Sequence, residues 1–233
     1  MPQFQEDNDW CNYQKKIAQI YDRQNYEPSL ASYALNASHS FLEKKFDSSK
    51  FFTKVLEVGA GSGKHLHYVK HGFEEYVLSD SNPNMIKLAE ENAPNKHRGL
   101  LSFEVIQAEA LPYEDNCFDR LIAAHVLEHM YSPHLVLKEW VRVLKPGGTL
   151  SVLIPTDPGI AWRIGRYLGP RGKALKMGFP YDYIMAREHV NSCNSLIALL
   201  RYYFPKRHEC WWPLLIPSID LNLFFVCNAI LKN

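Results

Sequence analysis

The sequence predicts an α/β fold, in which a mostly parallel sheet of seven strands carries helices on both faces and the last strand is antiparallel. Short apolar runs alternate with segments of helical periodicity between residues 51 and 155, as in βαβ units. The first run, 55–58, breaks into glycines at positions 59, 61 and 63, which is typical of a buried strand that ends in a ligand-binding turn. The 233 residues suit a single domain, 1–233, with a substantial core.

Residues 1–50 are expected to form a helical cap before the sheet. Apolar residues between 9 and 46 recur at helical rather than alternating spacing, which predicts two helices. Tyr13, Tyr21 and Tyr26 are candidates to close a pocket, and Tyr21 is the one we count as a substrate contact. The alternative is that these rings only fill the core of the cap.

The central part of the fold is expected over residues 51–155. Leu66, Val69 and Phe73 follow the glycine turn at helical intervals, which predicts a helix there. Asn82 is suited to cap another helix, which Pro83 opens. Further strands are predicted at 76–80, 101–106, 118–124 and 149–154, and a helix at 132–144 that the Lys-Pro-Gly-Gly of 145–148 ends.

The carboxyl ends of parallel strands meet at one edge of a sheet, where ligands of open α/β folds bind. Asp80 ends the second strand, 21 positions beyond Gly59, which is the place of a ribose-binding acid. The alternative is a carboxylate that only caps the turn or helix. Residues 107–109 and His125 follow later strands, so they are expected to line the same crevice.

Beyond residue 155 the alternation of strands and helices breaks. Residues 156–189 are rich in glycine, proline, aromatic and basic residues and are expected to form a lid or substrate-shaping insertion. Between 159 and 178 there are five basic residues and no acid. Residues 190–233 are expected to supply a helix capped at Asn191 or Ser192, then two apolar runs that form a closing hairpin.

Composition limits the classes of partner and compartment. A formal charge of +1 gives no long-range attraction to nucleic acid, so no nucleic-acid partner is expected. Five scattered cysteines without a CxxC pair indicate neither disulfides nor a zinc knuckle. The polar N-terminus lacks the pattern of a signal peptide, and prolines and polar residues interrupt the apolar stretch 211–231. We therefore expect a cytoplasmic protein without a transmembrane segment, for which peripheral contact with a membrane stays open.

The glycine turn differs from two related phosphate-binding turns. The dinucleotide pattern GxGxxG needs a glycine where the chain has Lys64. The P-loop pattern GxxxxGK[ST] needs a glycine at Val58 and a hydroxyl at His65. What remains is ExGxGxG, in which Glu57 disfavours a phosphate and favours a cationic ligand.

This turn resembles motif I of the class I S-adenosylmethionine-dependent methyltransferases, of the broad type-11 group. Four further segments are similar to that family in the same order: Leu78-Ser79-Asp80 with Asn84-Met85; Ala108-Glu109-Ala110-Leu111-Pro112-Tyr113 with Phe118-Asp119; His125-Val126-Leu127-Glu128-His129; and Leu144-Lys145-Pro146-Gly147-Gly148. Together they cover roughly 52–157. The resemblance implies a Rossmann-like sheet that binds S-adenosyl-L-methionine and releases S-adenosyl-L-homocysteine.

The resemblance also implies which residues contact this cofactor. Glu57, Gly59, Gly61 and Gly63 would contact its methionine end, Asp80 the ribose, and Ala108 with Glu109 the adenine edge. The chain departs from the common pattern at Gln107, where an acid often stands, although an amide can still bond adenine. The remaining candidates for cofactor contact are Ala60, Ser81, Gln107 and His125.

Methyl transfer from a sulfonium is an in-line displacement, so the protein has to align the reactants and, for a protonated acceptor, supply a general base. His125 and His189 are the candidate bases, with His129 third, and a purely structural role is the alternative for each. Residues 125–129 also spell HxxEH, a zinc-peptidase pattern. Its place at a strand-to-helix junction, without a recognisable third ligand, disfavours that interpretation. No metal is expected.

The methyl acceptor is expected to be a small anionic molecule, such as a glycosylated or lipid-linked metabolite, methylated on oxygen or nitrogen. The basis is the cationic segment 159–178, in which Arg163 and Arg166 are the candidate substrate contacts. A solvated basic surface on the lid is the alternative. A regulator or partner subunit that binds S-adenosylmethionine without transferring its methyl group is the alternative function.

Overall fold

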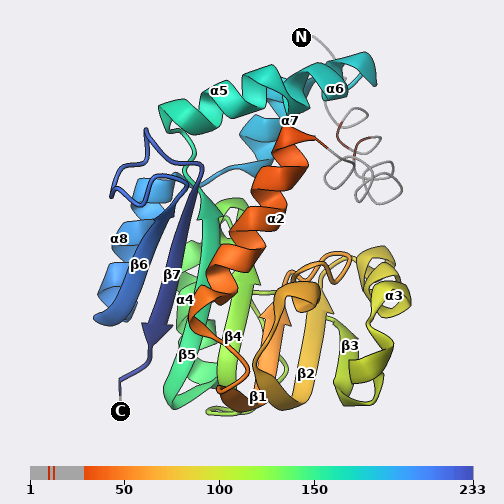
Figure 1. Cartoon of the computed structure of the whole chain (residues 1–233), viewed down its shortest axis with the longest axis vertical. Helices are drawn as coiled ribbons and strands as arrows, with labels where there is room; N and C mark the ends of the chain where they lie inside the picture. Colours follow the sequence, from red (N-terminus) through yellow and green to blue (C-terminus); the bar gives the residue numbers. More distant parts are fainter. Residues whose placement is uncertain (1–9, 11–12, 14–28, 233) are drawn as a thin grey trace, which may run out of the picture.

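The computed structural model describes residues 10, 13 and 29–232, and its centre is one seven-stranded sheet with the strand order β3-β2-β1-β4-β5-β7-β6 (Figure 1). β7 runs antiparallel to both of its neighbours, and the other pairings are parallel. The expected fold class is therefore confirmed. The strands are β1 Phe51–Val58, β2 Gly72–Asp80, β3 Leu101–Val105, β4 Phe118–Ala124, β5 Leu144–Pro155, β6 Lys206–Trp212 and β7 Phe224–Ile230.

The segment after the glycine turn differs from the prediction. Instead of a helix it forms a short 3-10 turn, His65–Tyr68, and Phe73 already belongs to β2. Only residues 64–71 separate Gly63 from β2, which is too short for a stable α-helix and its connections. Leu66, Val69 and Phe73 are nevertheless buried in one apolar layer, so their spacing reflected burial rather than helical periodicity.

β5 also begins earlier than predicted. Leu144 pairs with Phe118, whereas the next paired residue, Thr149, is opposite Arg120. Residues 145–148 therefore bulge out of the ladder, and Gly147 adopts a φ of 78° there. The Lys-Pro-Gly-Gly segment ends the preceding helix as expected, but it does so inside the strand.

Two layers of helices cover the sheet (Figure 1). α4 (Pro133–Val143) and α8 (Cys193–Tyr203) pack on one face, where Trp140, Leu137 and Leu196 are fully buried or nearly so. α2 (Leu30–Leu42) crosses the other face, against β5 and β7. α3 (Pro83–Asn92) follows β2, and the Asn82 side chain accepts the hydrogen bond of the Asn84 N–H, as expected of its N-cap.

One helix of the expected N-terminal cap, α2, packs on a face of the sheet. α2 begins at a reciprocal capping box of Ser29 and Ser32 and buries Leu42 completely against the sheet. It is thus a layer of the fold, because its apolar face lies along strands rather than over their ends. The first of the two predicted helices falls largely in residues 1–28, outside the described part of the chain except for Trp10 and Tyr13.

The expected insertion after β5 consists of three helices, α5 (Ile160–Leu168), α6 (Pro170–Lys176) and α7 (Tyr181–Glu188). Figure 1 shows α5 and α6 at one end of the molecule, above the carboxyl ends of the parallel strands. The chain returns at Ser192, which caps α8 by accepting the Ser195 N–H. None of the described helices combines the length and the apolar character that crossing a bilayer requires.

Candidate functional site

The glycine turn is a tight left-handed segment. Gly59, Gly61 and Gly63 have φ values of 65°, 54° and 75°. Residues with a Cβ adopt such positive φ values only at a cost in free energy. A Cβ on Gly59 would lie 2.5 Å from a methyl group of Val126, the residue after His125. A Cβ on Gly63 would lie 3.3 Å from Ala89 of α3. The turn therefore abuts both the end of β4 and the helix after β2.

Asp80 supports this turn. Its carboxylate accepts the Gly61 N–H at 3.0 Å and the Asn82 N–H at 2.8 Å. Burial raises the pKa of this carboxyl, and the two backbone hydrogen bonds oppose that rise. Asp80 thus stabilises the turn, which is the role given above as the alternative. It also stands at the strand end where a ribose-binding acid is expected. Its contact with ribose stays a prediction.

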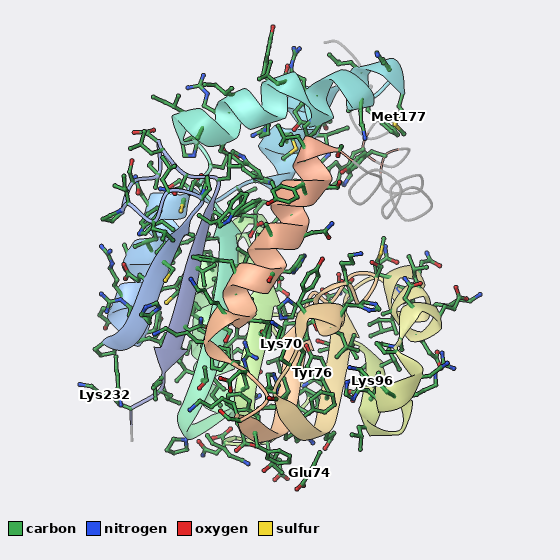
Figure 2. The ribbon with its side chains drawn as sticks, in the orientation of Figure 1. Lys70, Glu74, Tyr76, Lys96, Met177 and Lys232 are labelled. Atoms are coloured by element: carbon green, nitrogen blue, oxygen red, sulfur yellow. The ribbon has the colours of Figure 1, made fainter. Side chains whose placement is uncertain are left out.

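Glu57 lies within the sheet rather than on the turn. It is buried, and the hydroxyl of Tyr76, labelled in Figure 2, donates to its carboxylate at 2.5 Å. Burial raises the pKa of Glu57, and the nearby His65 lowers it. The carboxylate is therefore already engaged by β2, and a direct contact with a cofactor stays a prediction.

Residues 107–109 follow β3 at the same edge as Asp80, whose carbonyl accepts the Ile106 N–H. Gln107 and Glu109 are exposed, whereas Ala108 is buried and its carbonyl accepts the indole N–H of Trp140 at 3.1 Å. Ser81 is exposed next to Asp80. These positions share an edge with the glycine turn, as the sequence predicted, and their contacts with adenine and ribose stay predictions.

A buried ion-pair network, which the sequence did not predict, lies on the face of the sheet that α2 covers. The Arg120 guanidinium donates to both oxygens of Glu43, at 2.6 and 3.0 Å, and to the Ser151 hydroxyl. His65 contacts Glu43 at 3.0 Å and His39 at 3.1 Å. Burial would raise the pKa of Glu43, but Arg120 and His65 lower it to about 2. These five residues are called the buried ion-pair network below.

A second cluster forms where β4 ends. His125 has a φ of 61°, and its Nδ1 lies 3.5 Å from Oε1 of Glu128, which is almost fully buried. Within the described part of the chain, His125 Nε2 and Glu128 Oε2 are buried without a hydrogen-bond partner. Burial opposes the charge of Glu128, but His125 and His129 hold its pKa below the usual value. Buried polar atoms without a partner are few in folded proteins, and a catalytic role or a bound water or ion is among their explanations.

The insertion brings a third histidine and a second carboxylate to this cluster. His189 contacts Asp157 through Nδ1 at 2.9 Å, and its ring lies 5.2 Å from that of His129. His129 is fixed by donating from Nδ1 to the Glu188 carbonyl at 2.8 Å. We call His125, Glu128, His129, Asp157 and His189 the histidine–carboxylate cluster.

Backbone contacts hold the cluster together. The Glu128 carbonyl accepts the N–H groups of Val190 and Asn191, and the Asn191 amide donates to carbonyls of the 127–130 segment. The predicted bases His125 and His189 therefore lie in one place although 64 positions separate them (189 − 125). Sequence reasoning missed Glu128 and Asp157 as their partners, although Glu128 lies inside the quoted segment 125–129.

The predicted substrate contacts are only partly available to a ligand. Arg166 donates to Asp157 at 2.9 Å and to the Tyr181 hydroxyl at 3.1 Å, so its guanidinium is engaged inside the insertion. Arg163 is exposed on α5. Tyr21 lies outside the described residues. Contact of any of the three with a substrate stays a prediction.

The histidines of the HxxEH segment do not form a metal site in the described residues. His125 and His129 flank the Glu128 side chain at 3.5 and 3.9 Å, but no group of three or more histidine, cysteine, aspartate or glutamate side chains in this part of the chain is arranged to hold an ion.

Comparisons with known proteins agree with the sheet and the strand-end motifs. A family model described as a methyltransferase domain matches residues 56–152. The chain is 31% identical over 149 residues to a demethylmenaquinone methyltransferase of Protochlamydia amoebophila, and covers 60% of that protein with 61% of itself. It is 29% identical over 153 residues to a ubiquinone/menaquinone biosynthesis C-methyltransferase of Ectopseudomonas mendocina, with 62% of itself on 60% of that protein.

The fold is also similar to solved structures. The N-methyltransferase NodS of Bradyrhizobium japonicum, solved with S-adenosyl-L-homocysteine, aligns with a TM-score of 0.59 and 17% identity over 84% of this chain and 87% of its own. At that identity the likeness concerns the fold. The family match confirms the resemblance inferred from the five motifs. The chain spans about 60% of the length of the curated relatives it matches.

Proposed function

Because residues 56–152 belong to the methyltransferase-domain family, we propose that this chain is an S-adenosyl-L-methionine-dependent methyltransferase that releases S-adenosyl-L-homocysteine. The support is the coincidence of that match with the geometry of the strand ends. The glycine turn, Asp80 and the histidine–carboxylate cluster lie at one edge of the sheet, where ligands of open α/β folds bind.

The residues at this edge fit the proposed cofactor. A Cβ on Gly59 would lie 2.5 Å from Val126, so this position has no room for a side chain. Without side chains at the three glycines, a ligand there can approach the backbone. Gly59, Ala60, Gly61 and Gly63 would hold the methionine end, Asp80 with Ser81 the ribose, and residues 107–109 the adenine. The bound cofactor supplies an activated methyl group; alignment and proton removal are left to the protein.

The general base we propose is His125, and the observation that carries this is its buried, unpartnered Nε2. The other nitrogen, Nδ1, faces the Glu128 carboxylate at 3.5 Å. A carboxylate there orients the ring and stabilises the imidazolium that forms when Nε2 takes a proton from the acceptor. His189, with Asp157 at 2.9 Å, is the second base candidate in the same cluster.

The acceptor we propose is a small, anionic molecule, glycosylated or lipid-linked, that is methylated on oxygen or nitrogen. Arg163, exposed at the insertion, supports the anionic character. Transfer to carbon is a second candidate, because one of the similar proteins is named a C-methyltransferase. We propose the cytoplasm as the location, since the scattered cysteines suit a reducing compartment.

Two measurements test this proposal. The first is calorimetric titration of the protein with S-adenosylmethionine. The second is an assay of S-adenosylhomocysteine release with a metabolite extract or a short-chain demethylated naphthoquinol as the acceptor. The His125→Gln variant should lose about 10²- to 10⁴-fold in release rate at saturating S-adenosylmethionine. His134→Gln, on the exposed face of α4, is the matched control and should lose nothing.

Absence of cofactor binding would overturn the proposal. Binding without turnover on any acceptor would favour a non-catalytic regulator or partner subunit. Magnetic resonance of the methylated product separates oxygen, nitrogen and carbon acceptors.

A further inference from the structure

α5 presents an apolar stripe to solvent. Ile160, Ile164, Tyr167 and Leu168 are spaced at i, i+4, i+7 and i+8, which places them on one face of the helix. They are between 54% and 80% exposed. A surface helix of a globular protein normally turns its polar face outward, so this orientation is inverted.

The inverted orientation is fixed by contacts on the other face of α5. The ring of Trp162 packs against that of Phe224 at 5.5 Å between centroids, and Arg166 is held by Asp157 and Tyr181. The inner face of the helix thus belongs to the sheet and to the histidine–carboxylate cluster. The apolar stripe cannot rotate inward without breaking these contacts.

The loop between β6 and β7 extends the apolar surface. Leu214, Leu215 and Ile216 are consecutive and between 50% and 62% exposed. The loop is joined to α5, because the Asp220 carbonyl accepts the Ala161 N–H at 2.9 Å. Figure 1 shows this loop and α5 at the same end of the molecule.

Cations adjoin the stripe. Lys173 and Lys176 of α6 are exposed, as is Arg163 of α5, and none of the three forms an ion pair with another described residue. There is no acidic residue between positions 159 and 178 to offset them. Met177, labelled in Figure 2 where α6 ends, adds a further exposed apolar side chain.

We propose that α5, α6 and the 214–216 loop dock the protein on the surface of an anionic lipid bilayer. A helix with apolar residues outward and lysines and arginine beside them suits the boundary between headgroups and acyl chains. These exposed cations, which form no ion pair with another described residue, match the negative potential of anionic lipids. Docking on a bilayer needs no catalysis, so this inference goes beyond the proposed function. It would place α5, whose inner face contacts the histidine–carboxylate cluster, against the membrane.

Vesicle flotation tests the inference. The wild-type chain should float with vesicles of equal parts phosphatidylcholine and phosphatidylglycerol, and far less with phosphatidylcholine alone. The double variant Ile164→Glu/Leu168→Glu should lower the partition coefficient at least about tenfold, because two acyl-facing side chains become charged. Leu135→Glu and Tyr202→Glu, at exposed apolar positions of α4 and α8, are the matched controls and should float like the wild type.

A second pair of variants isolates the electrostatic part. Lys173→Gln and Lys176→Gln should each weaken binding to the anionic vesicles about fivefold and leave the residual binding to phosphatidylcholine unchanged. Unchanged calorimetric unfolding of all variants checks that they are folded.

Three results would overturn docking on lipid. One is a wild-type chain that stays at the bottom of the gradient with anionic vesicles. Another is flotation of Ile164→Glu/Leu168→Glu equal to that of the controls. The third is a dimer of the wild type in light scattering that this double variant abolishes, since a second copy of the chain would then cover the stripe. None of these readouts depends on turnover, so their failure is separable from failure of the proposed methyl transfer.

Discussion

Two groups of histidines and carboxylates lie beside one another, one buried and one partly exposed. They differ in how completely their buried polar atoms are paired. In the buried ion-pair network, both Glu43 oxygens accept from Arg120, whose Nε and Nη2 also donate to the Ser151 hydroxyl. In the histidine–carboxylate cluster, His125 Nε2 and Glu128 Oε2 are buried without a described partner. Only 5.8 Å separates the ring centroids of His39 and His125, one from each group.

The difference indicates what each group is for. A fully paired buried network holds elements in place, because removing one member leaves the other buried polar groups without their partners. A partly paired one keeps bonding capacity for a ligand or a proton, at some expense of stability. We infer that the buried ion-pair network holds α2 to the sheet and that the histidine–carboxylate cluster serves catalysis.

The largest expected effect is on stability, from Arg120→Met. This change leaves the Glu43 carboxylate buried without its main counter-charge and should cost about 3–5 kcal/mol in the free energy of unfolding, measured by urea denaturation. Arg201→Met, at an ion pair whose arginine side chain is 50% exposed, should cost at most about 1 kcal/mol. Equal costs for the two variants would remove the distinction between a structural network and ordinary surface pairs.

The same network should make the free energy of unfolding depend on pH in the acidic range. The pKa of Glu43 is lowered from 4.5 to about 2, so its contribution is fully present above pH 4.5 and is lost as the pH falls toward 2. The shift corresponds to about 3 kcal/mol. The difference between the urea-denaturation profiles of the wild type and Glu43→Gln isolates it from other carboxyls, such as Glu57, whose raised pKa acts in the opposite direction. Parallel profiles would contradict this account.

An intermediate effect is expected from Gly59→Ala, which disturbs the cluster without touching the network. The new Cβ would lie 2.5 Å from Val126 at a φ of 65°, so about 1–3 kcal/mol of stability should be lost. Displacement of the 125–126 segment should also weaken calorimetric binding of S-adenosylmethionine about tenfold. Gly172→Ala, where a Cβ meets nothing within 4 Å, should gain up to about 1 kcal/mol and bind normally.

The smallest change in stability is expected from Glu128→Gln. Because one of its oxygens already lacks a partner, loss of the charge should cost only about 1 kcal/mol. Turnover should nevertheless fall about 10²-fold, since His125 loses the carboxylate that orients its ring. A loss of stability as large as that of Glu43→Gln, with turnover retained, would reverse the roles of the two groups.

Local signals were enough to predict much of the cofactor-binding edge. The glycines at 59, 61 and 63 occupy positive-φ positions, Asp80 stands at the strand end, and Asn82 caps α3. Each is specified by its neighbours in the sequence. The helix predicted after the turn was wrong for the same reason, because apolar spacing alone does not distinguish burial in a short turn and strand from a helical face.

The sequence by itself thus determined the order of strands and turns, and with it the edge at which a ligand is expected, because those depend on local apolar runs, glycines and caps. Only the tertiary structure decided the partners of the buried charges. Glu43 and Arg120 are 77 positions apart, and His189 reaches the cluster through the fold of the insertion. Pairing over such distances depends on how helices pack across the sheet, and no local pattern of residues encodes that packing.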